Sequence, residues 1–207
     1  MDKSIRYWNR IAERYARQPI ANEAEYQKKL EVTRGYLKPE MRVLEFGCGT
    51  GSTALLHAPL VREYIAIDLA PNMIAIAERK RAESGLDNLQ FQVAALEDFA
   101  GQTESFDAVL GLNILHLVED RDQAIALVSQ LLKPGGVFVS STACLKQGLN
   151  PFRFIAPFTQ WFNLPLVKAF SRADLEHGLT GAGLRIDYQW VPEGNKLVYF
   201  LVAVKGE

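Results

Sequence analysis

The chain has 207 residues, with 23 lysines and arginines against 24 aspartates and glutamates, and a formal net charge of -1. This length suits one substantial core, so we expect a single domain over residues 1–207. The balanced charge offers no broad cationic surface for a polyphosphate backbone, which disfavours nucleic acid as the main partner. Cys48 and Cys144 lie far apart, without disulfide or zinc spacing. No apolar run has membrane-spanning length and the amino terminus lacks a signal core, so the sequence predicts a cytoplasmic protein without a metal site.

Residues 1–38 are expected to form an N-terminal helical lid. From Ile5 to Ala16, apolar residues recur at helical spacing with charged residues between them. A second helical pattern covers residues 24–36 and ends before Pro39. Both segments therefore precede the part of the chain in which strands begin.

Strands alternate with helices over residues 39–144, which we expect to form a cofactor-binding core. The predicted strands are 42–46, 64–67, 89–93, 108–112 and 137–141. Three helices are predicted between them: one that begins near residue 53, one over 71–84 and one over 121–132. Pro71 suits a first helical turn and Gly85 suits a helix end. This alternation predicts a parallel sheet covered by helices on both faces.

The last third of the chain has a different composition. Residues 148–170 are rich in aromatics and proline and contain no acidic residue, so residues 145–170 are expected to form an aromatic helical cap. A plain packing element, or a surface that contacts a membrane or a second subunit, remains an alternative. Residues 171–207 are expected to add a helix over 171–180 and a hairpin of strands at about 184–190 and 197–204, one of them antiparallel to the rest.

The strongest local signal is a glycine-rich turn between the first strand and the helix after it. The turn reads Glu45-Phe46-Gly47-Cys48-Gly49-Thr50-Gly51. Glycines allow the backbone to turn sharply and to approach a flat cofactor at the carboxyl edge of a parallel sheet. A dinucleotide fingerprint requires a further glycine where Ser52 stands, so the turn is poorly suited to NAD.

Five segments form a pattern in chain order: VLEFGCGTG at 43–51, IDLAPNM at 67–73, FDAV at 106–109, NILH at 113–116 and LKPGG at 132–136. In these segments the chain resembles the class I S-adenosylmethionine-dependent methyltransferases, specifically small bacterial proteins with a type 11 or type 12 methyltransferase domain. The resemblance covers most of the chain. It implies a Rossmann-like α/β fold with a seven-stranded, mostly parallel sheet, an antiparallel last strand and helices on both faces. It also implies S-adenosyl-L-methionine as the cofactor.

Two carboxylates are the main candidates for holding this cofactor. Asp68 ends the second strand about twenty residues after the turn, where a carboxylate can accept hydrogen bonds from both ribose hydroxyls. Capping of the next helix is the alternative for Asp68. The resemblance implies that Glu45 holds the amino group of the methionine part, whereas a buried acid that only orders the turn is the alternative. Gly51 could serve helix packing alone.

Further cofactor contacts follow from the resemblance. Many relatives bind adenine through an aspartate after the third strand, but this chain has Val93 and Ala94 there, and we expect the Leu96 amide and Glu97 to substitute. The complete predicted set is Tyr15, Glu45, Gly47, Cys48, Gly49, Asp68, Leu69, Met73, Leu96, Glu97 and Asn113. For Tyr15 and Met73, ordinary packing is the alternative.

The catalytic residue stays open. His116, expected one helical turn after Asn113, is the candidate general base, with a structural role as its alternative. Displacement at a sulfonium requires that nucleophile, methyl and sulfur are aligned and that water is excluded. A general base is required only if the acceptor must lose a proton. The predicted acceptor pocket consists of Trp8, His116, Phe158 and Trp161.

The sequence therefore predicts methyl transfer by in-line displacement to a small molecule with an apolar or aromatic body. A nicotinamide-dependent oxidoreductase and a non-catalytic S-adenosylmethionine-binding protein are the rival functions. No feature of the sequence indicates the oligomeric state or the kind of atom that is methylated.

Overall fold

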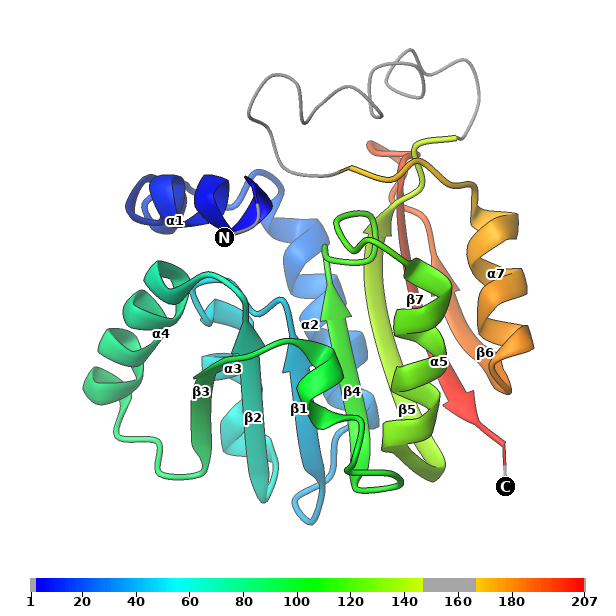
Figure 1. The fold of residues 1–207 in the computed structure, drawn as a ribbon, viewed down its shortest axis with the longest axis horizontal. Helices are drawn as coiled ribbons and strands as arrows, with labels where there is room; N and C mark the ends of the chain where they lie inside the picture. The colour runs from blue at the N-terminus through cyan, green and yellow to red at the C-terminus, as the bar shows by residue number, and fades with distance from the viewer. Residues whose placement is uncertain (1–2, 147–166, 207) are drawn as a thin grey trace.

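The computed structural model describes residues 3–146 and 167–206, and its centre is a seven-stranded sheet (Figure 1). The strand order is β3-β2-β1-β4-β5-β7-β6, and β7 is antiparallel to both of its neighbours. The strands are β1 (Arg42–Phe46), β2 (Glu63–Asp68), β3 (Leu89–Val93), β4 (Phe106–Leu112), β5 (Leu132–Ala143), β6 (Leu184–Trp190) and β7 (Val198–Lys205). The predicted mostly parallel sheet with an antiparallel last strand is confirmed.

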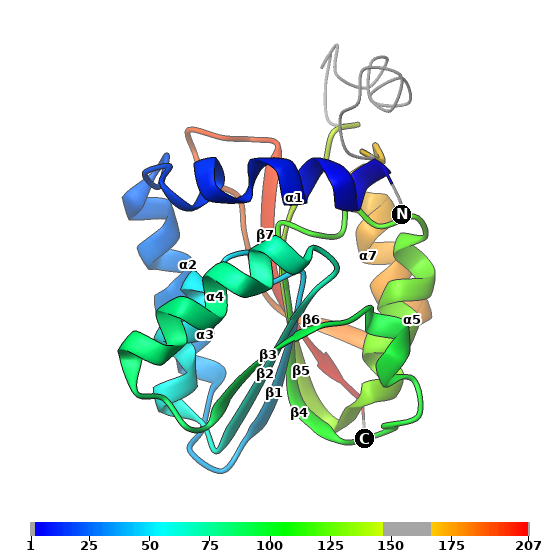
Figure 2. The same cartoon turned by 60° about the vertical axis from the view of Figure 1, so that its left-hand side comes forward.

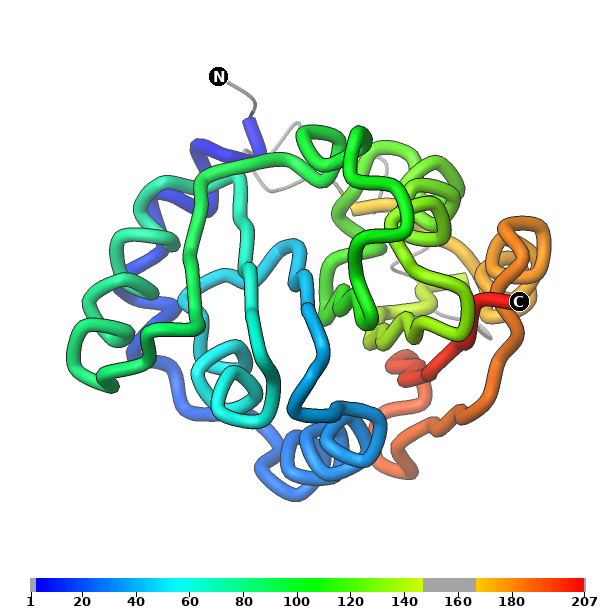
Figure 3. Tube along the Cα trace, turned by 90° about the horizontal axis from the view of Figure 1, so that it is seen from below, coloured from blue at the N-terminus to red at the C-terminus, as the bar shows by residue number. Residues whose placement is uncertain are grey.

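Helices cover both faces of this sheet. They are α1 (Lys3–Ala16), α2 (Glu23–Tyr36), α3 (Ser52–His57), α4 (Pro71–Ser84), α5 (Arg121–Leu131) and α7 (Arg172–Gly181), with short 3-10 helices η1 (Ala58–Leu60) and η2 (Leu96–Phe99). Seen from below, α2 lies on one side of the sheet and α5 and α7 lie on the other (Figure 3). The described helices include none that is long and apolar enough to span a membrane.

Strand residues alternate between two apolar cores. In β2, Ile65 and Ile67 pack into the core under α5 and α7, whereas Tyr64 and Ala66 pack into the core under α3 and α4. The central strands are buried on both faces, which explains why their sequences are continuous apolar runs. In the edge strand β6, exposed residues instead alternate with residues that are buried or partly buried.

Two strand boundaries differ from the expectation. β4 begins at Phe106 and β5 at Leu132, whereas the sequence suggested 108 and 137. Phe106 pairs with Leu132 before a register shift, and the Lys133 ammonium lies 2.7 Å from an Asp107 carboxylate oxygen. These contacts hold the Lys133-Pro134-Gly135-Gly136 turn in the sheet. The sequence prediction started β5 too late because proline and glycine usually interrupt strands.

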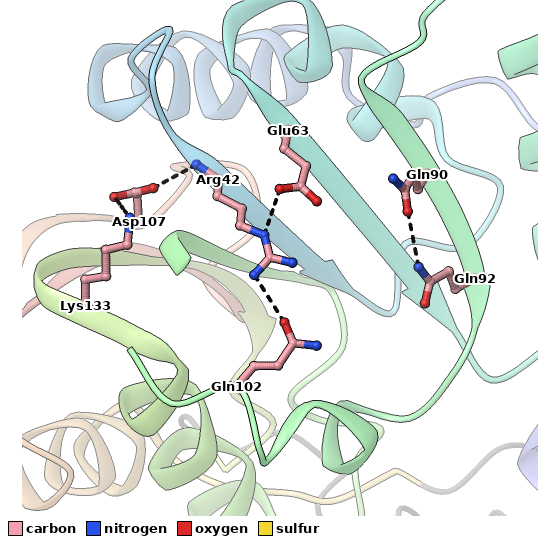
Figure 4. A network of polar contacts seen from close by, with 7 residues as sticks. All are labelled: Arg42, Glu63, Gln90, Gln92, Gln102, Asp107 and Lys133. Atoms are coloured by element: carbon pink, nitrogen blue, oxygen red, sulfur yellow. Dashed lines mark hydrogen bonds and ion pairs between the residues drawn. The ribbon is translucent and has the colours of Figure 1, made fainter. Parts of the chain in front are cut away.

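A polar network ties the amino ends of four strands together (Figure 4). The Arg42 backbone N–H donates to Asp107, and the Arg42 guanidinium donates to Glu63 at 2.8 Å and to Gln102 at 3.1 Å. Lys133 completes the connection to β5 through Asp107. A separate contact joins the neighbouring side chains Gln90 and Gln92 on β3. The carboxyl ends of the parallel strands lie at the opposite edge.

The first helix lies across that carboxyl edge, next to α4 (Figure 2). Ala12 packs with Met73 in a small apolar cluster, and Trp8 packs against it. The Asn72 N–H donates to the Asn9 side chain at 2.8 Å. α1 therefore lies over the sheet edge, and the role of residues 1–38 as a lid stays a prediction. Most of the expected cap at 145–170 lies outside the described residues.

Gly51 and Gly85 provide a test of how the turn after β1 packs. Both have a left-handed φ, +73° and +67°, but a Cβ at residue 51 would lie 2.5 Å from the Phe91 ring. A Cβ at residue 85 would meet no described atom within 4 Å. We expect Gly85→Ala to lower the free energy of unfolding by about 1 kcal/mol through backbone strain alone. Gly51→Ala adds a clash and should cost about 3 kcal/mol in urea unfolding. Equal losses in the free energy of unfolding for Gly51→Ala and Gly85→Ala would contradict this packing.

Candidate functional site

The glycine-rich turn is fixed to the carboxyl ends of β1 and β2. The Cys48 N–H donates to the Ile67 carbonyl at 3.0 Å, and Lys80 of α4 donates to the Thr50 carbonyl at 3.0 Å. Burial raises the pKa of the Cys48 thiol, which keeps it protonated and unreactive. Among the described residues, a Cβ at Gly49 would have only the Tyr15 ring within 4 Å, at 4.0 Å. The backbone of the turn thus presents an open face below Tyr15.

Asp68 connects this turn to the start of the next helix. Its Oδ2 accepts the Gly49 N–H at 2.9 Å, and its Oδ1 accepts the Ala70 N–H at 2.8 Å. Burial raises the pKa of Asp68, and these two backbone N–H donors oppose that shift. A carboxylate has about four acceptor positions, so these bonds leave roughly two for a ligand. Both alternatives for Asp68, helix capping and ligand binding, are therefore compatible with its geometry.

Glu45 is the second acid at this edge, and only 3% of it is exposed. The Tyr64 hydroxyl donates to its Oε2 at 2.7 Å. Burial raises the pKa of Glu45 to about 7, the Tyr64 hydrogen bond lowers it, and the charge of Asp68 raises it. Two acids beside each other in a low dielectric favour a cationic ligand.

Two tyrosines of the N-terminal helices lie near these acids. Tyr15 of α1 is 44% exposed, and burial of its hydroxyl and the charge of Asp68 raise its pKa. Burial also raises the pKa of Tyr26 on α2, with the charge of Glu45 contributing. The Trp8 ring packs edge-on against Tyr15, with ring centroids 6.0 Å apart. Trp8 and Tyr15 thus form one group above the sheet edge.

The residues predicted beside the adenosine lie in two environments. Met73 is buried in the cluster below α1, which favours its packing alternative. Leu69 is 48% exposed next to Asp68, whereas Leu96 is buried in η2 and Glu97 is exposed there. Their contacts with a cofactor stay predictions.

Asn113 and His116 follow β4 at the same edge. Asn113 has a left-handed φ of 58°, and its N–H donates to the Ser141 carbonyl at 2.6 Å. Residues 115–117 form a turn, so the expected helical spacing to His116 is wrong, because the left-handed Asn113 diverts the chain. The His116 Nδ1 lies 3.2 Å from the Thr142 hydroxyl, and burial lowers the pKa of His116 to about 4.

The structure thus brings together Glu45, the turn, Asp68 and Tyr15, with Asn113 and His116 after the neighbouring strand. Phe158 and Trp161 lie outside the described residues. Within the described ranges, no cluster of three or more histidines, cysteines and acids could hold a metal ion.

Sequence reasoning missed Tyr26 and Tyr64. For Tyr64 a signal existed: a tyrosine inside a fully buried strand needs a partner for its hydroxyl. Glu45 stands on the adjacent strand of the predicted sheet and was the available acceptor. For Tyr26, its position in the helical segment α2 carries no such signal.

The raised pKa of Glu45 makes a prediction for stability. Because the folded protein holds this proton more tightly than the unfolded chain, stability falls as pH rises from the unfolded value of 4.5 to about 7. We expect Glu45→Gln to raise the free energy of unfolding by about 2 kcal/mol at about pH 8.5, with little gain at about pH 5. Urea unfolding at both pH values measures this. Glu176→Gln is the control, because Glu176 also accepts a tyrosine hydroxyl but lies half-buried on α7. A gain that does not depend on pH would contradict the prediction.

Comparison with known sequences identifies relatives. A family model described as a methyltransferase domain matches residues 37–174. A ubiquinone biosynthesis O-methyltransferase of Xanthomonas axonopodis pv. citri is 39% identical over 116 residues, covering 55% of this chain and 48% of that protein. The uncharacterized methyltransferase YcgJ of Bacillus subtilis is 30% identical over 132 residues, covering 64% and 52%. The chain thus spans about half the length of the curated relatives it matches.

A solved structure shares the fold. The crystal structure of the Bacillus subtilis YcgJ protein has a TM-score of 0.71 at 18% identity, covering 87% of this chain and 99% of that one. Such low identity establishes the fold alone, whereas the family model covers more than half of the chain. The chain therefore belongs to the methyltransferase-domain family, and its fold is that of the class I S-adenosylmethionine-dependent methyltransferases.

Proposed function

We propose that this protein transfers the methyl group of S-adenosylmethionine to a small-molecule acceptor with an apolar or aromatic body. The observation that carries the proposal is the connection of Asp68 to the glycine-rich turn, with Glu45 beside it. Family membership supports the cofactor, and the names of curated relatives support a small acceptor.

The residues at the sheet edge fit this cofactor. Asp68 keeps acceptor positions for the two ribose hydroxyls while it holds the turn. The buried Glu45 suits the ammonium of the methionine part, since a cation favours its ionised form. The open backbone at Gly49 leaves room below Tyr15. When bound, the cofactor supplies an electrophilic methyl group on a sulfonium.

On the acceptor side, we propose alignment as the main contribution of the chain. A histidine whose pKa is lowered to about 4 is a weak base near neutral pH, because efficient general bases have pKa values near the working pH. The contact of His116 with Thr142 supports the structural alternative for this residue. Trp8 and Tyr15 above the edge would help to exclude water from the reacting atoms.

The remaining assignments also stay proposals. They are the acceptor pocket that includes Phe158 and Trp161, the division into lid, core, cap and C-terminal hairpin, a cytoplasmic location, and the absence of nucleic acid as a partner. The composition of residues 148–170 supports an apolar acceptor site, since such pockets consist mainly of apolar and aromatic side chains.

The cofactor assignment is tested by calorimetry with S-adenosylhomocysteine. We expect the wild type to bind it and Asp68→Asn to weaken binding about 10- to 100-fold, because a hydrogen bond to a charged acceptor is lost. Asp187→Asn is the matched control, since Asp187 also accepts a hydrogen bond, from Tyr36, but lies on the outer strand β6. Binding of NADH in place of S-adenosylhomocysteine would favour the oxidoreductase. If folded protein gives no heat of binding with either compound, both the methyltransferase and the oxidoreductase assignments are refuted.

The reaction itself is tested with isotopically labelled S-adenosylmethionine and a metabolite extract. We expect a labelled small molecule of apolar or aromatic character, detected by mass spectrometry, that Asp68→Asn forms more slowly at a cofactor concentration below saturation. Cofactor binding without any labelled product would instead support the non-catalytic binder.

A further inference from the structure

The Tyr64 hydroxyl is a polar group inside an otherwise apolar core. The Tyr64 side chain is fully buried, and it packs into the core that includes Val43, Ala66 and Leu89. Its partner Glu45 belongs to β1, where residue 45 pairs with Ala66, two positions after Tyr64. Both side chains therefore lie on the same face of the sheet.

A phenylalanine would fill this place in the core equally well, so the hydroxyl requires its own explanation. It donates to Glu45 Oε2 at 2.7 Å, and no described residue donates to the other carboxylate oxygen, Oε1. A hydrogen bond of this kind fixes the rotamer of the acid and satisfies one of its oxygens. The second oxygen is left for a ligand at the carboxyl edge.

We propose that Tyr64 is a positioning residue for the cofactor: its hydroxyl holds the Glu45 carboxylate in the orientation that accepts the ammonium of the methionine part. This inference rests on the proposed function, because it assigns Glu45 to that ammonium. In this role Tyr64 acts through Glu45 and needs no contact of its own with the cofactor or the acceptor.

The electrostatic surroundings of Glu45 give the hydroxyl a second effect. The groups that face this carboxylate are Tyr64 and Asp68 of β2, the Cys48 thiol of the turn and Tyr26 of α2. Burial and the charge of Asp68 favour the protonated acid, and the Tyr64 hydrogen bond is the contact that opposes them. A protonated Glu45 carries no charge to attract an ammonium. Loss of the hydroxyl should therefore raise the pH below which the cofactor amino group is no longer held.

The test uses Tyr64→Phe and two ligands that differ in one part. S-adenosylhomocysteine carries the amino acid moiety, whereas 5′-methylthioadenosine lacks it. We expect Tyr64→Phe to weaken S-adenosylhomocysteine about 10-fold or more near neutral pH, and to leave 5′-methylthioadenosine within about twofold, in calorimetry. The decline of S-adenosylhomocysteine binding on acidification should begin at higher pH than in the wild type.

The matched control is Tyr199→Phe. Tyr199 is also buried and donates its hydroxyl to a glutamate, Glu176, at 2.7 Å, but this pair joins β7 to α7. Tyr199→Phe should leave the affinity for both ligands and the pH profile unchanged. A merely structural role for Tyr64 predicts the same result for Tyr64→Phe, or an equal loss for the two ligands, and either outcome would overturn the proposal.

A further pair of variants keeps the test decisive if Tyr64→Phe alone does not fold. Glu45→Gln removes the buried charge that Tyr64→Phe alone would leave without its hydrogen-bond donor, so Glu45→Gln with Tyr64→Phe should fold. If Tyr64 acts through the Glu45 charge, this double variant binds S-adenosylhomocysteine as Glu45→Gln does. A further loss in the double variant would overturn the positioning role. A folded wild type that binds neither ligand would instead refute the proposed function.

Discussion

The site depends on one carboxylate that is bonded to two backbone segments. Asp68 accepts N–H groups from Gly49, after β1, and from Ala70, before α4. Hydrogen bonds to a charged acceptor are stronger than neutral ones, and these lie in a partly dry environment where a lost partner is costly. The turn and the start of α4 are therefore fixed relative to each other before any ligand binds, which reduces the ordering cost of binding.

The second acid imposes a cost on the folded protein. Burial of Glu45 beside Asp68 disfavours its charge, and the Tyr64 hydroxyl only partly offsets this. An apolar residue at position 45 would make a more stable sheet. A cation at this edge would relieve the same repulsion that destabilises the free protein. Stability and binding thus oppose each other at one residue, as expected where a site is built for a charged ligand.

The sequence allowed the elements and a parallel sheet covered on both faces to be predicted because apolar runs alternate with helical patterns throughout residues 39–144, whereas the strand order comes from the structure. It also located Asp68 and the turn, since both follow strands directly. It missed the early start of β5, where the Lys133–Asp107 pair overrides the usual effect of proline and glycine. It missed Tyr64 as well, although a tyrosine hydroxyl inside a buried strand needs a partner, because the hydrogen bond to Glu45 joins two strands that are separated in the sequence by α3. Tertiary contacts of this kind leave no periodic signal.

The contacts of α1 differ in kind from those of the sheet that it covers. The sheet is held by two large apolar cores, whereas α1 packs on α4 through a small cluster around Ala12 and Met73. Its ion pair between Glu13 and Arg79 is exposed, and such pairs contribute little to stability. Segments with few buried contacts open at lower free energy than a central sheet. Lifting α1 would carry Tyr15 away and uncover the edge with Asp68 while leaving the turn and both acids in place, so a ligand could enter without disturbing these sheet-borne groups.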